Sequence, residues 1–390
     1  MRIGIDASRA VRPDQTGTET YSFYLIRALL RAQRDHQLIL YSPEELPLDM
    51  LPGMNTAGAS APYPGALRTE TERWSVRVIP FPRLWTHVRL NWELWRNPPD
   101  LLFISAHVMP VACPVPTVVT VHDLGYLYYP EAHRAFDRWY LHWSTRRHVR
   151  LATHIVADSQ ATREDLARHY GADLSRVRVI YPGYDEKLQR VEDPQVIAAA
   201  KARYHIQGDY LLYLGTLQPR KNLSRLIEAF VRAALPWSSS ESGGLQLVLA
   251  GKKGWGYEAL SRLISDMGLQ NRVIFPGYIA PEDKAALLSG AKALVFPSLY
   301  EGFGMPVLEA MVCGVPVLTS RVSSLPEVAG DAAVLVDPSN VDDIAAGLRR
   351  IVHEPDLRRT LVERGYRQAQ KFSWQDAARQ LWEVFDSIHR

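Results

Sequence analysis

Short apolar runs alternate with longer amphipathic stretches along the whole of this 390-residue chain, and this alternation constrains the fold most. Solidly apolar runs of about five residues are typical of parallel strands that helices cover on both faces of a sheet. Strand, helix and strand repeated in this way predict doubly wound α/β sheets. The expected strands lie at residues 2–6, 37–41, 76–80, 101–105, 117–121, 153–157, 177–181, 210–215, 245–250, 272–276, 293–297, 315–319 and 332–336.

The domain organisation follows from length and from one interruption of the pattern. Domains hold about 100–200 residues, so one ordinary core is not enough for this chain. Residues 181–194 combine turn residues and charges without a period, which suits a linker. We therefore expect Rossmann-like domains at 1–182 and 183–371, and an amphipathic helix at 372–390 that packs back on the first domain. Ligands bind at the carboxyl ends of such strands, so two domains that face each other place the expected site in the cleft between them.

Composition excludes several classes of protein. Apolar residues make up 47% and charged residues 22%, which is ordinary for a globular protein and excludes disorder, collagen and a coiled-coil rod. A net charge of +3 is too small to indicate nucleic acid as a partner. Cys113 and Cys313 are too few for a disulfide scaffold or a structural zinc site. The N-terminus lacks the apolar region of a signal peptide, and no apolar run approaches the ~18–20 residues of a membrane span, so we expect a cytoplasmic protein.

Two common nucleotide-binding motifs are missing from the positions where they would be expected. The loop after the first strand has one glycine instead of the dinucleotide-binding pattern of three. Residues 251–260, GKKGWGYEAL, have glycines in the wrong order for that pattern, and no Ser or Thr follows a Gly-Lys pair as a P-loop requires. We interpret this segment as a turn. The sequence therefore argues against a dehydrogenase and against a P-loop enzyme.

The segment at 298–311, SLYEGFGMPVLEAM, carries the strongest chemical signal. A glycine-containing loop follows an expected strand, and Pro306 suits the first position of a helix, where no N–H donor is needed. The amides around Gly304 would then lie at a helix N-terminus, where the helix dipole and exposed N–H groups favour an anion such as a diphosphate. Glu301 and Glu309 flank this loop, and an acid beside an anion site suits contact with sugar hydroxyls.

With these residues in view, the sequence resembles glycosyltransferase family 4, the retaining enzymes with the GT-B fold. Glu301 to Glu309 is similar to the paired-glutamate motif of that family. The resemblance covers nearly every motif of the C-terminal half and is looser in the N-terminal half. It is greatest to bacterial mannosyltransferases that build surface polysaccharides. The other matching strings are YLGTLQPRKN at 213–222, FPGYI at 275–279, GVPV at 314–317, LPEV at 325–328, VHDL at 121–124 and the start from Asp6 to Gly17.

The resemblance implies a role for each matching residue. Glu301 contacts hydroxyls of the donor sugar, and His122 bonds the sugar near the bond that breaks. Glu309 bonds the ribose, while Lys221 and Arg220 neutralise the leaving diphosphate. The residues implied to hold the rest of the donor are Phe303, Gly304 and Met305 through their amides to the diphosphate, Gly17 close to the phosphates, and Gly277, Tyr278, Ile279 and Lys284 around the base.

The charge that develops on a leaving diphosphate decides what the site must supply. Fixed cations and backbone donors stabilise that charge without a metal ion, and no Asp-x-Asp string or His/Cys metal spacing occurs. We therefore expect a metal-independent enzyme with no cofactor. Many family members carry Arg directly after the glycine that Gly215 matches, whereas this chain has Thr216, so we expect the diphosphate to depend on Arg220 instead.

Residues 133–154 interleave five Arg, four His and a single acid with Phe136, Trp139, Tyr140 and Trp143. Two interpretations are open. Aromatic and basic residues at helical spacing suit a membrane surface or an anionic lipid-linked acceptor. They also suit a helix whose aromatics are core and whose arginines are solvated. Residues 83–96 are ambiguous in the same way.

We expect a glycosyltransferase that moves mannose from GDP-mannose onto a growing glycan or lipid-linked acceptor, at the inner face of the membrane or free in the cytoplasm. Three alternatives remain: a UDP-sugar donor, a sugar-nucleotide epimerase of the same architecture, and a non-catalytic glycan-binding relative. The presence of Lys221, Glu301 and Glu309 together argues against the last of these.

Overall fold

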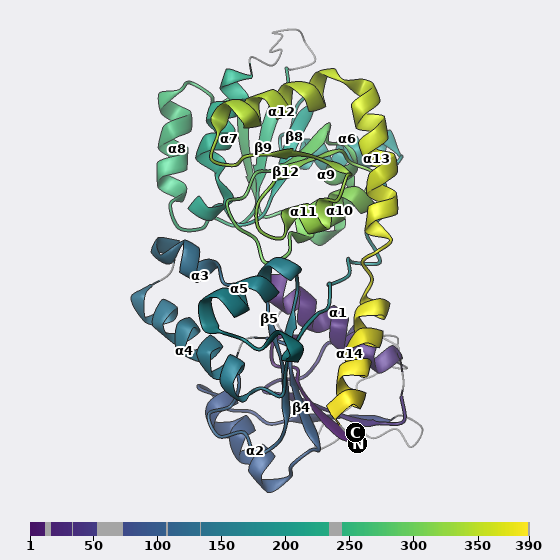
Figure 1. Cartoon of the computed structure of the whole chain (residues 1–390). Helices are drawn as coiled ribbons and strands as arrows, with labels where there is room; N and C mark the ends of the chain where they lie inside the picture. The colour runs from purple at the N-terminus through teal and green to yellow at the C-terminus, as the bar shows by residue number, and fades with distance from the viewer. Residues whose placement is uncertain are drawn as a thin grey trace. The chain divides into compact units, whose positions relative to one another are not determined.

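A computed structural model describes residues 1–11, 17–32, 34–52, 73–106, 108–132, 134–233 and 244–388 (Figure 1). The described residues form two compact units. The first comprises Met1–Leu124, Arg134–Gly183 and Phe372–Arg390, and the second comprises Gly125–His133 and Tyr184–Lys371. The described stretch between Val179 and Pro194 contains no helix or strand. The short segment Gly125–His133 belongs to the second unit, although the residues before and after it in the chain belong to the first.

The first unit is built on a seven-stranded parallel sheet with the order β3-β2-β1-β4-β5-β6-β7. Strands β2 and β3 extend the sheet on one side of β1, and β4 to β7 extend it on the other side. The strand order therefore reverses between β1 and β4. These strands are β1 (Arg2–Asp6), β2 (Gln37–Ser42), β3 (Trp74–Val78), β4 (Leu101–Ile104), β5 (Thr117–Val121), β6 (His154–Ala157) and β7 (Val177–Val179).

The second unit repeats this plan with a six-stranded parallel sheet of order β10-β9-β8-β11-β12-β13, so the order reverses between β8 and β11. Its strands are β8 (Tyr210–Leu214), β9 (Gln246–Ala250), β10 (Val273–Gly277), β11 (Ala293–Phe296), β12 (Val317–Ser320) and β13 (Ala333–Val336). The prediction of two doubly wound, Rossmann-like sheets is confirmed, and no strand end differs from its predicted position by more than two residues.

Helices connect the strands in both units. Those of the first unit are α1 (Gly17–Arg31), α2 (Asn91–Arg96), α4 (Ala135–Leu151), α5 (Gln160–Tyr170) and α14 (Trp374–Ile388). Those of the second are α3 (Gly125–Tyr128), α6 (Pro194–Arg203), α7 (Leu223–Arg232), α8 (Tyr257–Asp266), α9 (Pro281–Ser289), α10 (Met305–Val312), α11 (Leu325–Ala329), α12 (Val341–His353) and α13 (Pro355–Ala369). No helix in the described part of the chain is long and apolar enough to cross a bilayer.

The last helix completes the core of the first unit. Helix α14 lies along α1 (yellow beside purple in Figure 1), and its buried side chains join a hydrophobic cluster with β1 and β4. Trp382 and Phe385 are almost fully buried there, and Phe385 meets the ring of Phe103 edge to face. The start of α14 packs closely on Gly183, where a Cβ would lie 2.3 Å from the backbone nitrogen of Trp374.

Candidate functional site

The residues predicted to carry the chemistry of the second unit follow β8 and β11, the two strands between which the order of the sheet reverses. Loops that leave adjacent parallel strands at such a reversal diverge and leave room for a ligand at the carboxyl edge of the sheet. The loop after β8 ends in a 3₁₀ turn at Pro219–Lys221, and the loop after β11 carries Glu301.

Two cations converge on the Glu301 carboxylate. Lys221 Nζ lies 2.5 Å from Glu301 Oε1, and Arg220 Nη1 lies 3.6 Å from Oε2 and donates to the carbonyl of Tyr300 at 2.8 Å. Side chains of adjacent residues usually point apart, but the 3₁₀ turn that Pro219 begins brings these two to the same acid. Lys221 and Glu301 are each only 8% exposed, so this is a buried ion cluster.

The cluster holds Glu301 in its charged form. Burial alone would raise the pKa of this carboxyl, but the charges of Lys221 and Arg220 outweigh it and the pKa lies below its usual range. An ionised carboxylate accepts hydrogen bonds and cannot donate one. Glu301 is therefore suited to accept bonds from hydroxyl groups, and the cations beside it are suited to a second anion.

Hydrogen bonds from a neighbouring turn fix the backbone of the Glu301 loop. Ser324 Oγ donates to the carbonyls of Glu301 at 2.9 Å and Phe303 at 2.8 Å, while the amide of Glu301 donates to Ser323 Oγ at 3.0 Å. Ser323 has a φ of 51°, a conformation that side chains adopt rarely, so the turn is held in place by its surroundings. The sequence analysis did not single out either serine, although both directly precede the matched string at 325–328.

The same loop is supported by α3, the segment that follows the chain out of the first unit. The ring of Tyr128 stacks on that of Tyr300 with centroids 4.9 Å apart. Tyr129 donates a hydrogen bond of 3.5 Å to the carbonyl of Leu299. Because Tyr300 directly precedes Glu301, these contacts contribute to the position of the carboxylate.

Helix α10 begins at Met305 with Gly304 as its cap, one residue before the start at Pro306 that the sequence indicated. Gly304 has a φ of 111°, and a Cβ there would lie 2.7 Å from Leu325, so glycine is required both for conformation and for space. The amides of Phe303, Gly304 and Met305 precede the first complete turn of the helix, where N–H groups lack intrahelical acceptors. Their geometry suits an anion.

Glu309 lies inside α10 and forms an ion pair with Lys284 of α9. Glu309 is 6% exposed, whereas the Lys284 side chain is 31% exposed. The structure therefore brings together two residues that the resemblance assigned to the ribose and the base. Gly277 and Tyr278, also assigned to the base, lie at the end of β10, where Tyr278 is half exposed and Ile279 is buried.

Residues 251–256, interpreted above as a turn, brace the loop that carries the cations. Leu217 donates to the carbonyl of Lys252 at 2.9 Å, and Gly254 donates back to the carbonyl of Leu217 at 3.0 Å. A Cβ at Gly251 would lie 1.9 Å from the carbonyl oxygen of Gly215, so the two loops touch backbone to backbone. The glycine pattern therefore serves close loop packing, which explains why it does not follow a dinucleotide-binding order.

In the first unit, His122 follows β5 and forms a buried pair with Asp158, which follows β6. Nδ1 lies 2.6 Å from Asp158 Oδ2, and Nε2 lies 3.0 Å from the carbonyl of Ser105. Burial alone would lower the pKa of His122, but the charge and hydrogen bond of Asp158 and the Ser105 carbonyl together raise it. Since both ring nitrogens face acceptors, this geometry favours the imidazolium form. A sugar hydroxyl that bonded Nε2 would have to replace the Ser105 carbonyl.

Asp158 was not among the predicted site residues. It stands at the carboxyl end of a buried strand, one strand away from His122, and that position was a usable signal.

Gly17 was one of the predicted site residues, and it is the exposed first residue of α1. A Cβ at Gly17 would meet nothing within 4 Å in the described structure, so steric crowding there does not explain the glycine.

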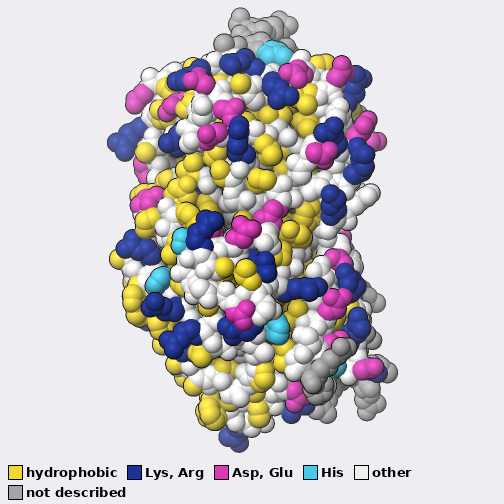
Figure 2. Space-filling model, viewed as in Figure 1, with side chains coloured by type: hydrophobic (Ala, Val, Ile, Leu, Met, Phe, Trp, Pro, Cys, Tyr) yellow, Lys and Arg dark blue, Asp and Glu magenta, His cyan; other side chains and the backbone are white. Residues whose placement is uncertain are grey.

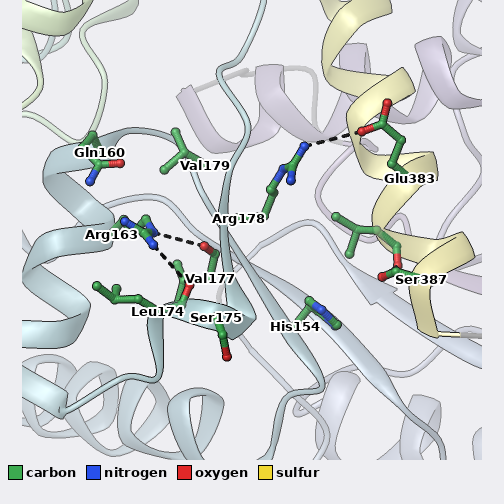
Figure 3. Close-up of a pocket in the computed structure, with 11 residues that line it drawn as sticks. His154, Gln160, Arg163, Leu174, Ser175, Val177, Arg178, Val179, Glu383 and Ser387 are labelled. Atoms are coloured by element: carbon green, nitrogen blue, oxygen red, sulfur yellow. Dashed lines mark hydrogen bonds and ion pairs between the residues drawn. The ribbon is translucent and has the colours of Figure 1, made fainter.

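A separate cavity of about 490 Å³ lies beside β7 in the first unit (Figure 3). Arg163 donates to the carbonyls of Val177 and Leu174, each at 3.2 Å, and Arg178 lies 3.5 Å from Glu383 of α14. None of the predicted site residues lines this cavity. Among the residues that the structure describes, no three His, Cys, Asp or Glu side chains are arranged to hold a metal ion.

Family models match both halves of the chain. Residues 15–188 match the family model described as Glycosyltransferase Family 4, and residues 200–368 match the model described as Glycosyl transferases group 1. The O-antigen chain mannosyltransferase B of Escherichia coli is 30% identical over 388 residues, which cover 97% of this chain and 98% of that protein.

Solved structures share the fold at lower identity. Sucrose-phosphate synthase from Thermosynechococcus elongatus superposes with a TM-score of 0.73 at 21% identity, over 100% of this chain and 99% of that one. Anabaena Alr3699/HepE, solved in complex with UDP and glucose, gives a TM-score of 0.72 at 20% identity, over 99% of each chain. The chain therefore belongs to glycosyltransferase family 4, has the GT-B fold and is a glycosyltransferase.

Proposed function

We propose that this glycosyltransferase moves a mannosyl group from GDP-mannose, with retention at the anomeric carbon, onto a growing glycan carried by a lipid. The observation that carries the donor sugar and the acceptor class is the near full-length match to the O-antigen chain mannosyltransferase B of Escherichia coli. The second unit supports the chemistry, because it combines a carboxylate with a lowered pKa, two cations and a helix N-terminus at one sheet edge.

Each of these groups has a part in the proposed reaction. The amides at the start of α10, together with Lys221 and Arg220, stabilise the negative charge that grows on the diphosphate as the glycosidic bond breaks. Glu301 accepts hydrogen bonds from hydroxyls of the transferred sugar. Glu309 accepts a bond from the ribose, and Lys284 beside it reaches the polar edge of the base. The diphosphate oxygen helps to deprotonate the acceptor hydroxyl on the same face of the sugar.

The donor is tested by incubating the purified chain with GDP-mannose, UDP-glucose, UDP-galactose and UDP-N-acetylglucosamine and measuring release of the nucleoside diphosphate. We expect GDP-mannose to be consumed fastest, and faster still when a lipid-linked oligosaccharide is added. The anomeric configuration of the product, read by NMR, tests retention. Preference for a UDP-sugar would overturn the donor assignment, and formation of an epimer without any acceptor would overturn transfer itself.

A UDP-sugar donor is the second candidate. The specific observation in its favour is that Alr3699/HepE, which shares this fold, was solved with UDP and glucose. The likeness to that protein is 20% identical and concerns the fold, whereas the mannosyltransferase match is 30% identical along the chain. The donor panel separates the two candidates directly.

We further propose that the reaction needs no metal ion or other cofactor, because Lys221, Arg220 and the α10 amides already provide positive potential for the diphosphate. EDTA is therefore expected to leave the rate within about twofold, well below the effect of losing a single charge-stabilising contact. Inactivation by EDTA that magnesium or manganese reverses would contradict this prediction.

A further inference from the structure

Three segments of the first unit form one continuous surface. They are residues 81–96, which include a π-helical turn and α2, residues 108–113, and helix α4. His87 hydrogen-bonds the hydroxyl of Tyr140 at 2.7 Å, which ties the first segment to α4. Trp95 donates to the carbonyl of Ala112 at 2.7 Å, and Arg147 of α4 donates to the carbonyl of Val111 at 2.7 Å. We call this region the aromatic–arginine surface.

Large hydrophobic side chains are concentrated on it. Phe136 is 70% exposed, Trp139 is 59% exposed and Trp95 is 62% exposed, so the interpretation of these aromatics as core is wrong. Scattered single hydrophobic residues are normal on a protein, but a contiguous group indicates an interaction site. In the described part of the first unit, every exposed large hydrophobic side chain except Leu48 belongs to this surface: Phe81, Leu84, Val88, Trp92, Trp95, Val111, Phe136, Trp139 and Leu151.

The aromatic rings of α4 form a stripe that leads from solvent to the body of the unit. Residues three or four apart share one face of a helix, and here the centroids of successive rings are 5.8–6.5 Å apart. Phe136 and Trp139 stand at the exposed N-terminal end, whereas Tyr140 and Trp143 are partly buried against His87. The exposed rings are thus anchored by packed ones, which favours a rigid surface over a set of loose side chains.

The charge of this surface is strongly one-sided. Among its described carboxylates, Glu93 is buried and lies in ion pairs with Arg77 and Arg89, so Asp137 is the exposed one. Guanidinium groups lie over the rings of Trp92 and Trp143 at about 5 Å, which places positive charge among the aromatics. The exposed arginines are Arg83, Arg96, Arg138, Arg146 and Arg150. In Figure 2, yellow hydrophobic and dark blue basic side chains lie next to one another at the lower left, where Figure 1 labels α4 and α2.

We propose that the aromatic–arginine surface binds the surface of an anionic phospholipid bilayer. Tryptophan and phenylalanine side chains enter the boundary between headgroups and acyl chains, and arginines contact the phosphates while their stems cover apolar surface. A second copy of the chain fits less well, because a two-fold interface would set arginines against arginines with Asp137 as the exposed acid. Nucleic acid fits less well because the aliphatic side chains of Leu84, Val88 and Leu151 offer bases nothing to stack on.

The test is sedimentation of the full chain with vesicles of phosphatidylcholine alone and with vesicles that contain about 30% phosphatidylglycerol. We expect binding to the anionic vesicles, and we expect about 0.5 M salt to weaken it strongly. The double variant Phe136→Ser/Trp139→Ser and the charge variant Arg138→Glu/Arg146→Glu should each lower vesicle binding at least about tenfold. The matched controls are Leu48→Ser, an exposed hydrophobic side chain of the same unit outside this surface, and Arg359→Glu, an exposed arginine of the second unit.

Release of nucleoside diphosphate from a soluble donor is measured on the same variants. It should stay at the wild-type level, because all four substituted positions are exposed on α4 and none belongs to the loops described above. This readout separates the membrane proposal from the proposed function, which can fail while vesicle binding persists. Equal binding to neutral and anionic vesicles, or wild-type binding by both variants, would overturn the proposal. So would a dimer that the variants dissociate, or binding of single-stranded RNA that anionic vesicles do not displace.

Discussion

Each unit holds a buried acid–base pair at the carboxyl edge of its own sheet, and the two pairs differ in which partner can titrate. In the second unit, Glu301 meets Lys221 and Arg220, cations that stay charged at any physiological pH. In the first unit, Asp158 meets His122, whose charge is lost within the range that proteins experience. Burial opposes ionisation of the acid in both pairs, but the pKa values of the two acids shift in opposite directions.

The pKa of Glu301 is lowered, whereas the pKa of Asp158 is raised. Burial raises the pKa of both carboxyls. The charges of Lys221 and Arg220 outweigh this effect at Glu301, whereas His122 does not outweigh it at Asp158. The ion cluster of the second unit thus keeps its acid charged, which suits the diphosphate binding proposed above. The first unit holds a pair whose charge depends on pH. The following variants test this difference, beginning with the largest expected effect.

Lys221→Ala should lower kcat/KM by a factor that corresponds to about 2–4 kcal/mol of lost transition-state stabilisation. The reason is that a cation near the leaving diphosphate binds the transition state more tightly than the substrate. Arg220→Ala should have a smaller effect, because Arg220 also serves the Tyr300 carbonyl and lies farther from Glu301. The matched control is Lys292→Ala, which removes a lysine from an ion pair with Asp209 at the surface. Steady-state kinetics decide the matter, and full activity of Lys221→Ala would remove this lysine from the site.

Glu301→Ala should lower kcat at least about 100-fold, because contacts to the sugar that strengthen in the transition state are lost. The fold should tolerate this change better than it tolerates loss of Lys221. Removing the acid leaves cations that a bound diphosphate can satisfy, whereas removing the lysine leaves a buried carboxylate with one ion-pair partner, Arg220, at the longer distance of 3.6 Å. Thermal unfolding with and without GDP distinguishes the two, since GDP should stabilise Glu301→Ala. Turnover near the wild-type level would exclude Glu301 from the active site.

The sequence predicted the fold well because periodicity reports burial directly. Strands such as β8 (Tyr210–Leu214) are apolar and buried throughout, because helices cover both faces of a parallel sheet. The largest shift concerns the third strand, expected at 76–80 and found at Trp74–Val78. Its last bond to β2 runs from the amide of Ile79 to the carbonyl of Ser42, and prolines follow at positions 80 and 82, where the chain leaves the sheet.

The candidate site was predictable where residues are close in sequence and less so where the fold brings distant residues together. The 3₁₀ turn with Arg220 and Lys221 and the start of α10 are local, because Pro219 begins the first and Pro306 lies in the first turn of the second. The contribution of Ser323 to Glu301 spans 22 residues, and that of Asp158 to His122 spans 36. Serine and aspartate are common beside strand ends, so only the packed sheets distinguish these two from solvated ones.

Glu309→Ala should raise the KM for the donor about tenfold and change kcat little, because a ribose contact is similar in the ground and transition states. The structure adds that Lys284 is partly exposed, so water can solvate it when its partner is removed. Asp342→Ala, which breaks an exposed ion pair with Arg232 on the far helices of the same unit, is the control. A defect confined to kcat would show that Glu309 acts on the reacting sugar instead of the nucleotide.

The smallest effects concern pH and test the comparison of the two pairs most directly. The folded pKa of Glu301 lies below its unfolded value, so its contribution to the free energy of unfolding is present above about pH 4.5 and is lost as pH falls through the folded pKa. The folded pKa of His122 lies above its unfolded value, so its contribution is present below about pH 6.5 and is lost as pH rises through the folded pKa. The two pairs therefore weaken at opposite ends of the pH range.

Asp158→Asn isolates the second of these effects, because it removes the carboxylate that raises the pKa of His122 and keeps a side chain of the same shape. NMR titration of the His122 ring should show a lower pKa in the variant. Denaturant unfolding should show that wild-type stability declines more than that of Asp158→Asn between pH 6 and pH 9, about the range over which histidine loses its proton. Glu301→Gln should leave this decline unchanged and instead flatten the loss of stability below about pH 4.5. An unchanged His122 titration in Asp158→Asn would mean that the Ser105 carbonyl, which accepts from Nε2, is enough to keep the ring charged.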